Sequence, residues 1–289
     1  MQRRQFLGFF ALFLAGCTGA QVSQNADNPP LPAVIRFSVT DETGIEPLEE
    51  KFSELRLALA AALETEVEFV AVENQNAAAV LIKSGDIDLA LAGPSEYVVI
   101  RTRSNAVPVV GITRPNYRSV LATKAGKPIT SLANLKGKTI ALSDIGSTSG
   151  HLGPVAMIIA AGLDPQNDVK LEMLGDDGSI AALQQGTVDA WGGSATDYEA
   201  LSGGDAAAFP ILEEGPLLPN DIFLASSSLR PEWITVIKER MLAHEEALTE
   251  AIALHHAKYV GSTLTSVEDS DYDSIRDAYR AIGQGEFIQ

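Results

Sequence analysis

The sequence predicts an α/β protein of two lobes, each built on a mostly parallel β-sheet with helices on both faces. Strand patterns and helix patterns alternate along most of the chain, and this alternation is typical of parallel sheets. It occurs twice, with the segments GDID at 85–88 and GTVD at 186–189 in matching places. A chain of 289 residues is long enough to give each lobe its own core.

The first run begins with alternating polar and apolar residues at 35–39, which predict a strand. A helix is expected over 47–63, because large apolar side chains recur there at helical spacing and share one face. These side chains are Leu48, Phe52, Leu55, Leu59 and Leu63. The run continues with a strand at 67–72, a helix at 77–83 and a strand at 87–91.

The second run follows Tyr117 and repeats this order. Its expected strands cover 119–123, 138–142, 169–173 and 188–191. Its expected helical segments cover 131–135, 150–161 and 179–185, and two C-terminal helices cover about 232–259 and 271–282. Ligands of such sheets bind at the carboxyl ends of the strands, so we expect a site in the cleft between the lobes.

Residues 1–16 have the pattern of a secretory signal peptide. Arg3 and Arg4 precede an apolar run at 6–14 that is too short to remain as a membrane span. The run ends in LAGC, which resembles the lipobox of bacterial lipoproteins, where the signal is cut before the cysteine and lipid is attached to the thiol. The letters RRQFL also resemble a twin-arginine export signal, except that Gly8 follows in place of the usual lysine.

Cys17 is therefore the expected lipidation site, and it is the only cysteine, which excludes an intrachain disulfide. The small, polar, proline-bounded residues of 17–32 predict a flexible tether. We expect a periplasmic or extracytoplasmic protein that is held at the membrane only by this lipid. The net charge of −17 argues against binding to nucleic acid or to anionic lipid.

Three consecutive hydroxyl residues between two glycines mark the predicted ligand site, in the segment SDIGSTSGHLGP at 143–154. The segment starts a helix, whose first turn has unpaired N–H groups and a positive dipole end. Glycines allow the backbone to approach a ligand closely. The arrangement predicts an oxyanion site that needs no cationic side chain, and the alternative is simple helix capping by one serine. The residues are Ser147, Thr148, Ser149 and Gly150.

The segment 132–154, with LKGK before STSG, resembles the phosphate-, phosphite- and phosphonate-binding proteins of ABC importers. Shorter matches extend the resemblance over about 35–250. It implies a type II periplasmic binding protein with two crossover connections that closes on its ligand and delivers it to ABC permease subunits. We expect a monomer with a first lobe of 33–117 and 228–289, a second lobe of 118–227, and hinges near 116–119 and within 216–230.

In the resembled family the Ser-Thr-Ser hydroxyls and the following amides hold the oxyanion, which implies this role for Ser147 to Gly150. The resemblance also places Asp221 at the ligand. Asp176 stands where the family usually has a histidine, and an ionised Asp can only accept hydrogen bonds. It would repel a dianion but accept a bond from a protonated oxyanion.

Two further departures leave the exact ligand open. Gln75 stands where the family often has a tyrosine, and Thr196 stands where binders of aminoalkyl phosphonates carry a carboxylate. Aminoethylphosphonate is therefore disfavoured, whereas phosphite, methylphosphonate, phosphate and other anions remain candidates. Tyr97, Tyr117 and His151 are further candidates for ligand contact, with structural packing or a surface position as the alternative for each.

A binding protein, not an enzyme, is the expected function. The letters GSTSG at 146–150 differ from a hydrolase elbow, because Thr148 holds the place of the nucleophilic serine. A hydrolase, or a ligand-sensing lipoprotein of the same fold for another anion, remains the alternative. No cofactor and no metal site is expected.

The lipobox makes a direct prediction. Cys17→Ser removes the thiol that would carry lipid, so the folded lobes should form normally but no longer fractionate with membranes. Ser23→Ala, in the same tether, is the matched control and should stay with the membrane fraction. Membrane fractionation of both variants checks this, and a Ser variant that remains membrane-bound would contradict the lipid anchor.

Overall fold

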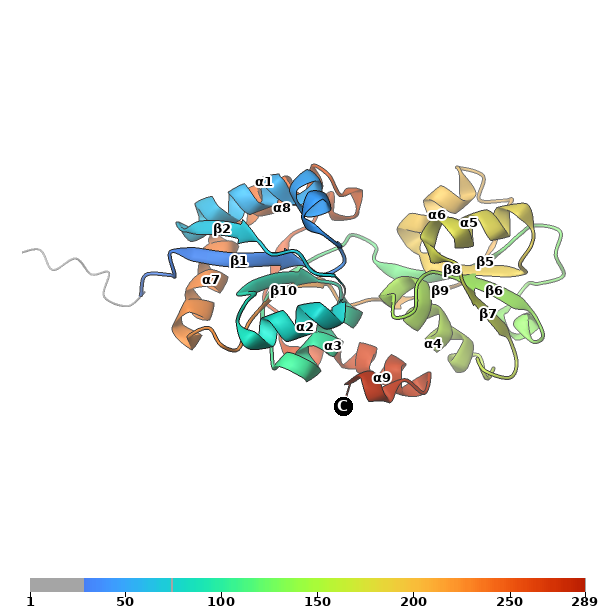
Figure 1. The fold of residues 1–289 in the computed structure, drawn as a ribbon. Coiled ribbons are helices and arrows are strands. Elements are labelled where there is room, and N and C mark those ends of the chain that lie inside the picture. Colours follow the sequence, from blue (N-terminus) through green and yellow to red (C-terminus); the bar gives the residue numbers. More distant parts are fainter. Residues whose placement is uncertain (1–28, 74, 289) are drawn as a thin grey trace, which may run out of the picture.

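The computed structural model describes residues 29–73 and 75–288, without the side chains of 75 and 76. The expected signal peptide, Cys17, much of the tether and the side chain of Gln75 lie outside the described residues. Two β-sheets, each flanked by helices, lie side by side and are joined by connecting segments (Figure 1).

The first sheet has six strands in the order β11-β4-β10-β3-β1-β2. β1 pairs in parallel with both β2 and β3, whereas β10 runs antiparallel to β3 and β4. The strands are β1 (Val34–Val39), β2 (Glu66–Phe69), β3 (Leu89–Ala92), β4 (Val107–Ile112), β10 (Asp221–Ala225) and β11 (Leu264–Thr265).

Helices cover both faces of this sheet because both faces are apolar. On one face α1 packs with α7 and α8 over a core that includes Phe37, Leu55 and Ile237. On the other face α2 and α3 pack over a core that includes Ile82 and Tyr272. The helices are α1 (Ile45–Leu63), α2 (Gln75–Ser84), α3 (Pro94–Ser104), α7 (Pro231–Ala243) and α8 (Glu245–Ala253).

The second sheet has five strands in the order β7-β6-β8-β5-β9, with β6 parallel to β7 and β8, and with β5 antiparallel to β8 and β9. The strands are β5 (Arg118–Thr123), β6 (Thr139–Leu142), β7 (Lys170–Met173), β8 (Ala190–Ser194) and β9 (Ile211–Leu217). The helical segments are η1 (Leu132–Leu135), η2 (Thr148–Leu152), α4 (Gly153–Ala160), α5 (Gly175–Gln185) and α6 (Ala195–Ser202).

The chain passes between the sheets by two connections, 113–117 between β4 and β5 and 218–220 between β9 and β10. The expected second-lobe range of 118–227 is wrong at its end. Asp221–Ala225 forms β10, which is wholly buried in the first sheet between β3 and β4. The sequence does not predict this strand, because the short, fully buried segment shows no alternation of polar and apolar residues.

Several other elements depart from the expected pattern. The helix expected over 232–259 is interrupted at His244, which ends α7 and precedes α8. No element had been expected at α3, β4, α6 or β9. The last expected helix becomes η4 (Asp269–Tyr272), α9 (Asp273–Ala281) and η5 (Gly285–Ile288). α9 packs against α3 of the first lobe and α4 of the second, so it spans both lobes (Figure 1).

The GDID and GTVD segments perform the same structural task in the two lobes. Gly85 and Gly186 each follow a helix with φ of +79°. The acid that ends each segment then accepts from the backbone of a neighbouring strand. Asp88 Oδ2 accepts from the N–H of Arg36 (2.9 Å), and Asp189 Oδ2 accepts from the N–H of Thr139 (3.1 Å).

Asp88 also accepts from the Arg36 side chain, at 2.8 Å to Nε and 2.8 Å to Nη2. Asp88→Asn should therefore lower the free energy of unfolding by about 2 kcal/mol, because it replaces the charged acceptor of three hydrogen bonds with a neutral amide. Asp86→Asn is the control: Asp86 is exposed and 4.0 Å from Arg36, so its loss should change stability by less than about 0.5 kcal/mol. Urea unfolding curves measure both, and equal midpoints would contradict the assignment.

Candidate functional site

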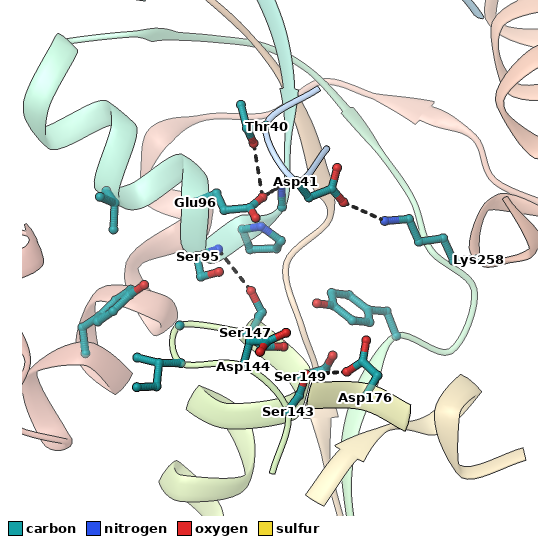
Figure 2. A pocket seen from close by; sticks show the side chains of 18 of the residues that line it. Thr40, Asp41, Ser95, Glu96, Ser143, Asp144, Ser147, Ser149, Asp176 and Lys258 are labelled. Carbon is teal, nitrogen blue, oxygen red and sulfur yellow. Dashed lines mark hydrogen bonds and ion pairs between the residues drawn. The ribbon is translucent and has the colours of Figure 1, made fainter. Parts of the chain in front are cut away.

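A cavity of about 710 Å³ lies between the lobes and is lined by residues of both (Figure 2). The first lobe contributes the loop after β1 and the start of α3. The second lobe contributes the loop between β6 and η2 and the starts of α5 and α6. These segments all follow the carboxyl ends of strands, where ligands of α/β sheets bind. The hinge connection 113–117 and the C-terminal segment complete the lining.

Of the predicted oxyanion residues, Ser147, Thr148 and Ser149 line this cavity, whereas Gly150 does not. Ser147 precedes η2 and caps it, because its Oγ accepts from the N–H of Gly150 at 3.2 Å. η2 is one turn of π-helix, a local irregularity that is frequent at functional sites. N–H groups of the first helical turn have no acceptor within the helix, so the turn presents amides beside the Ser147 and Ser149 hydroxyls. A Cβ on Gly150 would overlap the Ser143 side chain, which explains the glycine.

Thr148 links the two lobes across the cleft. Its Oγ1 accepts from the N–H of Ser95 at 3.1 Å, and Ser95 lies in the first turn of α3 (Figure 2). The beginnings of two helices, one from each lobe, therefore face each other at the cavity. This hydrogen bond brings the two lobes into contact, and the cavity is present while they are in contact.

Tyr117 and Arg114 extend the site along the hinge connection. The Arg114 guanidinium lies 3.6 Å from the centre of the Tyr117 ring, and both residues line the cavity. Burial raises the pKa of the Tyr117 hydroxyl, which lies beside the hydroxyls of Ser149 and Thr148. The oxyanion segment thus has a cation in its surroundings, contrary to the expectation of a site without cationic side chains.

Asp221 lies behind this cation and does not line the cavity. It is 2% exposed, its Oδ2 accepts from the Tyr259 hydroxyl at 2.6 Å, and its Oδ1 is 3.5 Å from Arg114 Nη1. Lys258 Nζ is 3.9 Å from Asp221 Oδ2 and 3.5 Å from Asp41 Oδ2. Asp221 therefore holds in place Arg114 and Lys258, the two cations that reach the cavity. Asp221 itself does not reach the cavity, where direct contact with a ligand had been expected.

Asp176 lines the cavity at the start of α5, and its Oδ1 accepts from the Ser143 hydroxyl. A carboxylate in the first turn is favoured by the helix dipole, and this hydrogen bond fixes its orientation beside the oxyanion segment. Thr196, at the start of α6, lines the same cavity. Its neighbour Asp197 also lines the cavity, but the Asp197 carboxylate is already occupied, because it accepts from the N–H and the hydroxyl of Ser194 at the start of α6.

Tyr97 and His151 do not line the cavity, so the expectation of ligand contact is not met for either. Tyr97 is fully buried in the first-lobe core, and its hydroxyl donates to Asp269 Oδ1 at 2.7 Å. His151 is buried, and its Nδ1 accepts from the N–H of Gly146 at 3.0 Å. Burial lowers the pKa of His151, which keeps this nitrogen unprotonated as an acceptor. His151 therefore shapes the loop before η2.

Carboxylates outnumber cations around the cavity. Among the described lining residues, only Arg114 and Lys258 are Lys or Arg. The acids are Asp41, Glu73, Glu96, Asp144, Asp176 and Asp197. Burial and the nearby Asp41 raise the pKa of Glu96 to about 7, although its Oε2 accepts from the N–H of Gly93 at 2.6 Å. Burial disfavours the charged forms of Arg114 and Lys258, but the nearby carboxylate of Asp221 raises the pKa of both side chains.

Four of the residues that line the cavity were not expected from the sequence: Ser95, Glu96, Arg114 and Lys258. Arg114 had one usable signal, because it lies three residues before Tyr117 at the edge of the expected hinge. Lys258 comes from a distant C-terminal segment and had none. In the part of the chain that the structure describes, no group of three or more His, Cys, Asp or Glu side chains could hold a metal ion. Within the same residues, no helix has the length and apolar character needed to cross a membrane.

Comparison with known proteins gives relatives over most of the chain. The phosphate-import protein PhnD of Mycolicibacterium smegmatis is 25% identical over 292 residues, covering 92% of this chain and 91% of that protein. XAC2383 from Xanthomonas citri bound to ATP has a TM-score of 0.71 at 14% identity, covering 88% of this chain and 98% of the other. PhnD1 from Prochlorococcus marinus in complex with methylphosphonate has a TM-score of 0.68 at 18% identity, covering 88% and 100%.

The structural likeness confirms the expected fold, the two-lobed α/β fold of type II periplasmic binding proteins. The profile of a family described as “ABC transporter, phosphonate, periplasmic substrate-binding protein” matches residues 38–272. That range includes the second sheet, the first sheet except for most of β1, the hinge connections and the oxyanion segment. The chain therefore belongs to the family of periplasmic phosphonate substrate-binding proteins of ABC transporters.

Proposed function

We propose that this protein captures a small phosphorus oxyanion in the interlobe cleft and delivers it, chemically unchanged, to the permease of an ABC importer. One observation carries the proposal. The start of η2, with Ser147 and Ser149, borders a cavity lined by both lobes, in a chain of the phosphonate-binding family. A helix start offers oriented N–H donors and a positive dipole end, which suits an anion.

The acidic cleft limits the charge that this ligand can carry. The donors at η2 and the Arg114 guanidinium act at short range, whereas the surrounding carboxylates repel a dianion. Asp176 can accept a hydrogen bond from an oxyanion that keeps one proton. A monoanion with one P–OH group therefore fits both the donors and the acceptor. Phosphite, phosphate and substituted phosphonates all have such a form.

Closure of the cleft completes the proposed mechanism. The connections 113–117 and 218–220 are the segments about which the lobes can move, and the first of them carries Arg114 and Tyr117 into the site. The contact between Ser95 and Thr148 joins the lobes when the cleft is closed. Ligand capture by closure of this kind places the anion between two helix starts, where oriented amides replace water.

We also propose that the mature protein is a monomer held at the outer side of the membrane by lipid on Cys17. The lipobox-like letters LAGC support this anchor, and the polar segment 17–32 gives it reach. The RRQFL letters support export through the twin-arginine route. The family description supports the extracytoplasmic location itself.

The double variant Ser147→Ala/Ser149→Ala tests the oxyanion site. Thr148 is retained because its hydroxyl binds Ser95 across the cleft. Each hydroxyl bond to an anion contributes roughly 1.5–3 kcal/mol, so loss of both should weaken binding of phosphate, phosphite or methylphosphonate by about 100-fold or more. Calorimetry with each probe measures this.

The control for the double variant is Ser131→Ala, before η1 on the same lobe, which should bind each probe like the unsubstituted chain. Melting of the double variant should change little, since loss of the Ser147 cap costs only ~1 kcal/mol. Retained affinity in a well-folded double variant would remove the proposed site, and an unsubstituted chain that binds none of these probes would overturn the proposed function.

The raised pKa of Glu96 predicts how binding depends on pH. Below about pH 7 this carboxyl keeps its proton, and above it the group adds a negative charge to the cleft. Anion affinity should therefore fall by about fivefold as pH rises through this range, beyond the effect of ligand titration. Glu96→Gln keeps an acceptor for the N–H of Gly93 but cannot ionise, so it should remove the part of the pH dependence that is not due to the ligand. Calorimetry of both proteins with one probe isolates the difference, and identical pH profiles would exclude a role for Glu96.

A further inference from the structure

The C-terminal segment formed by α9 and Ile282, directly after it, packs against both lobes (Figure 1). Its beginning is fixed to the first lobe. Arg276 Nη2 donates to Asp269 Oδ1 at 2.6 Å, and the Tyr97 hydroxyl of α3 donates to the same oxygen at 2.7 Å. Tyr279 is 5% exposed and belongs to the first-lobe core. The segment therefore moves with the first lobe.

The end of this segment reaches the second lobe. Ile282 packs against the first-lobe core that includes Tyr272 and also against the second-lobe core that includes Ile158. One residue later, a Cβ on Gly283 would lie 3.6 Å from Gln166 Nε2, in the loop after α4. The apolar side chain of Ile282 is therefore shared between the two lobes.

The second lobe makes a matching contact with the first. Leu152, at the end of η2, is fully buried and belongs to the same first-lobe core as Tyr279. A Cβ on Gly146 would lie 3.5 Å from the Tyr279 hydroxyl, so the loop before η2 also approaches α9. We call the packing of Ile282, Leu152 and Tyr279 between the lobes the interlobe apolar contact.

Charge in the cleft opposes this contact. Each lobe contributes three acidic side chains to the described lining of the cavity, and like charges on facing walls repel each other. The repulsion favours separation of the lobes, whereas burial of apolar surface between them favours closure. The acids are Asp41, Glu73 and Glu96 in the first lobe, and Asp144, Asp176 and Asp197 in the second.

The interlobe apolar contact does not require a bound anion. Ile282 and Leu152 do not line the cavity, so a ligand takes no part in their packing. The hydrogen bond from the Ser95 N–H to Thr148 Oγ1 also joins the lobes through protein groups alone. A large aliphatic side chain stabilises the form in which it is buried. The chain itself therefore stabilises the closed form.

We propose that the interlobe apolar contact holds the lobes together before a ligand binds, so that the closed form predominates in the free chain. A ligand then enters when the lobes part, and it adds its own contacts to a closed form that already exists. Two of the three side chains come from residues after 272, where the match to the family ends. The inference does not depend on the identity of the ligand.

Small-angle X-ray scattering of the purified, unliganded chain tests the proposal through the radius of gyration. Ile282→Asp would bury a carboxylate between two apolar cores, so it should lower the ratio of closed to open molecules by at least about 100-fold. Its radius should therefore exceed that of the unsubstituted chain. Ser274→Asp adds the same charge at an exposed position of α9, and this matched control should keep the unsubstituted radius.

Ile282→Ser is a second variant that separates opening of the cleft from fraying of the C-terminal segment. At low salt the acids of the two walls should hold this variant open. Its radius should fall toward the unsubstituted value between about 0.05 and 1 M salt, because salt screens their repulsion. Urea unfolding shows whether each variant keeps a cooperative transition, and Ile282→Ser decides the test if Ile282→Asp does not fold.

A folded Ile282 variant that keeps the unsubstituted radius at every salt concentration would overturn the inference. A salt-independent enlargement of Ile282→Ser would overturn it too, because it would indicate fraying. The same holds for an unsubstituted chain whose radius shrinks when methylphosphonate is added, since its free form would then be open. If calorimetry shows no binding of phosphate or methylphosphonate, the proposed function fails, but the unliganded variants still decide this inference.

Discussion

In the proposed mechanism, oriented backbone donors at the start of η2 allow so acidic a protein to hold an anion. Carboxylates outnumber cations around the cleft, so long-range attraction cannot bring the ligand into place. Amides of the first turn of η2 act only at hydrogen-bond distance, and their strength depends on the exact geometry of the loop before them. His151 fixes that loop through Gly146, and Asp221 holds Arg114 close to it.

The same constraint explains which parts of the site could be predicted from the sequence. Donors at η2 come from consecutive residues, so Ser147 to Gly150 were visible as a local pattern, as was Asp176 at another helix start. Arg114 and Lys258 reach the cavity through tertiary contacts with Asp221, which no local pattern encodes. Sequence position does not reveal which way a side chain points, so it could not show that Tyr97 and His151 lie away from the cavity. Tyr97 turns into the core, and His151 bonds to its own loop.

The fold followed from the sequence wherever periodicity was strong. α1 and the parallel strands β1, β2 and β6 formed close to their expected ranges, because one apolar face or a buried run specifies each of them. β10 and β4 were missed because neither shows an alternation of polar and apolar residues. Because β10 belongs to the first sheet, the lobe boundary lies earlier in the chain than expected. Pairing between segments that are far apart in the chain is not visible in a local sequence pattern.

α9 has a consequence for the time during which a ligand stays bound. Ile282 packs against the cores of both lobes, so any motion that opens the cleft must separate it from one of them. That separation exposes apolar surface to water and adds to the barrier for opening. Ligand release is then slower for a given set of contacts with the ligand, because α9 must first separate from one of the lobes. Residence time is thereby set partly by a segment that lies outside the family-matched range and touches both halves of the molecule.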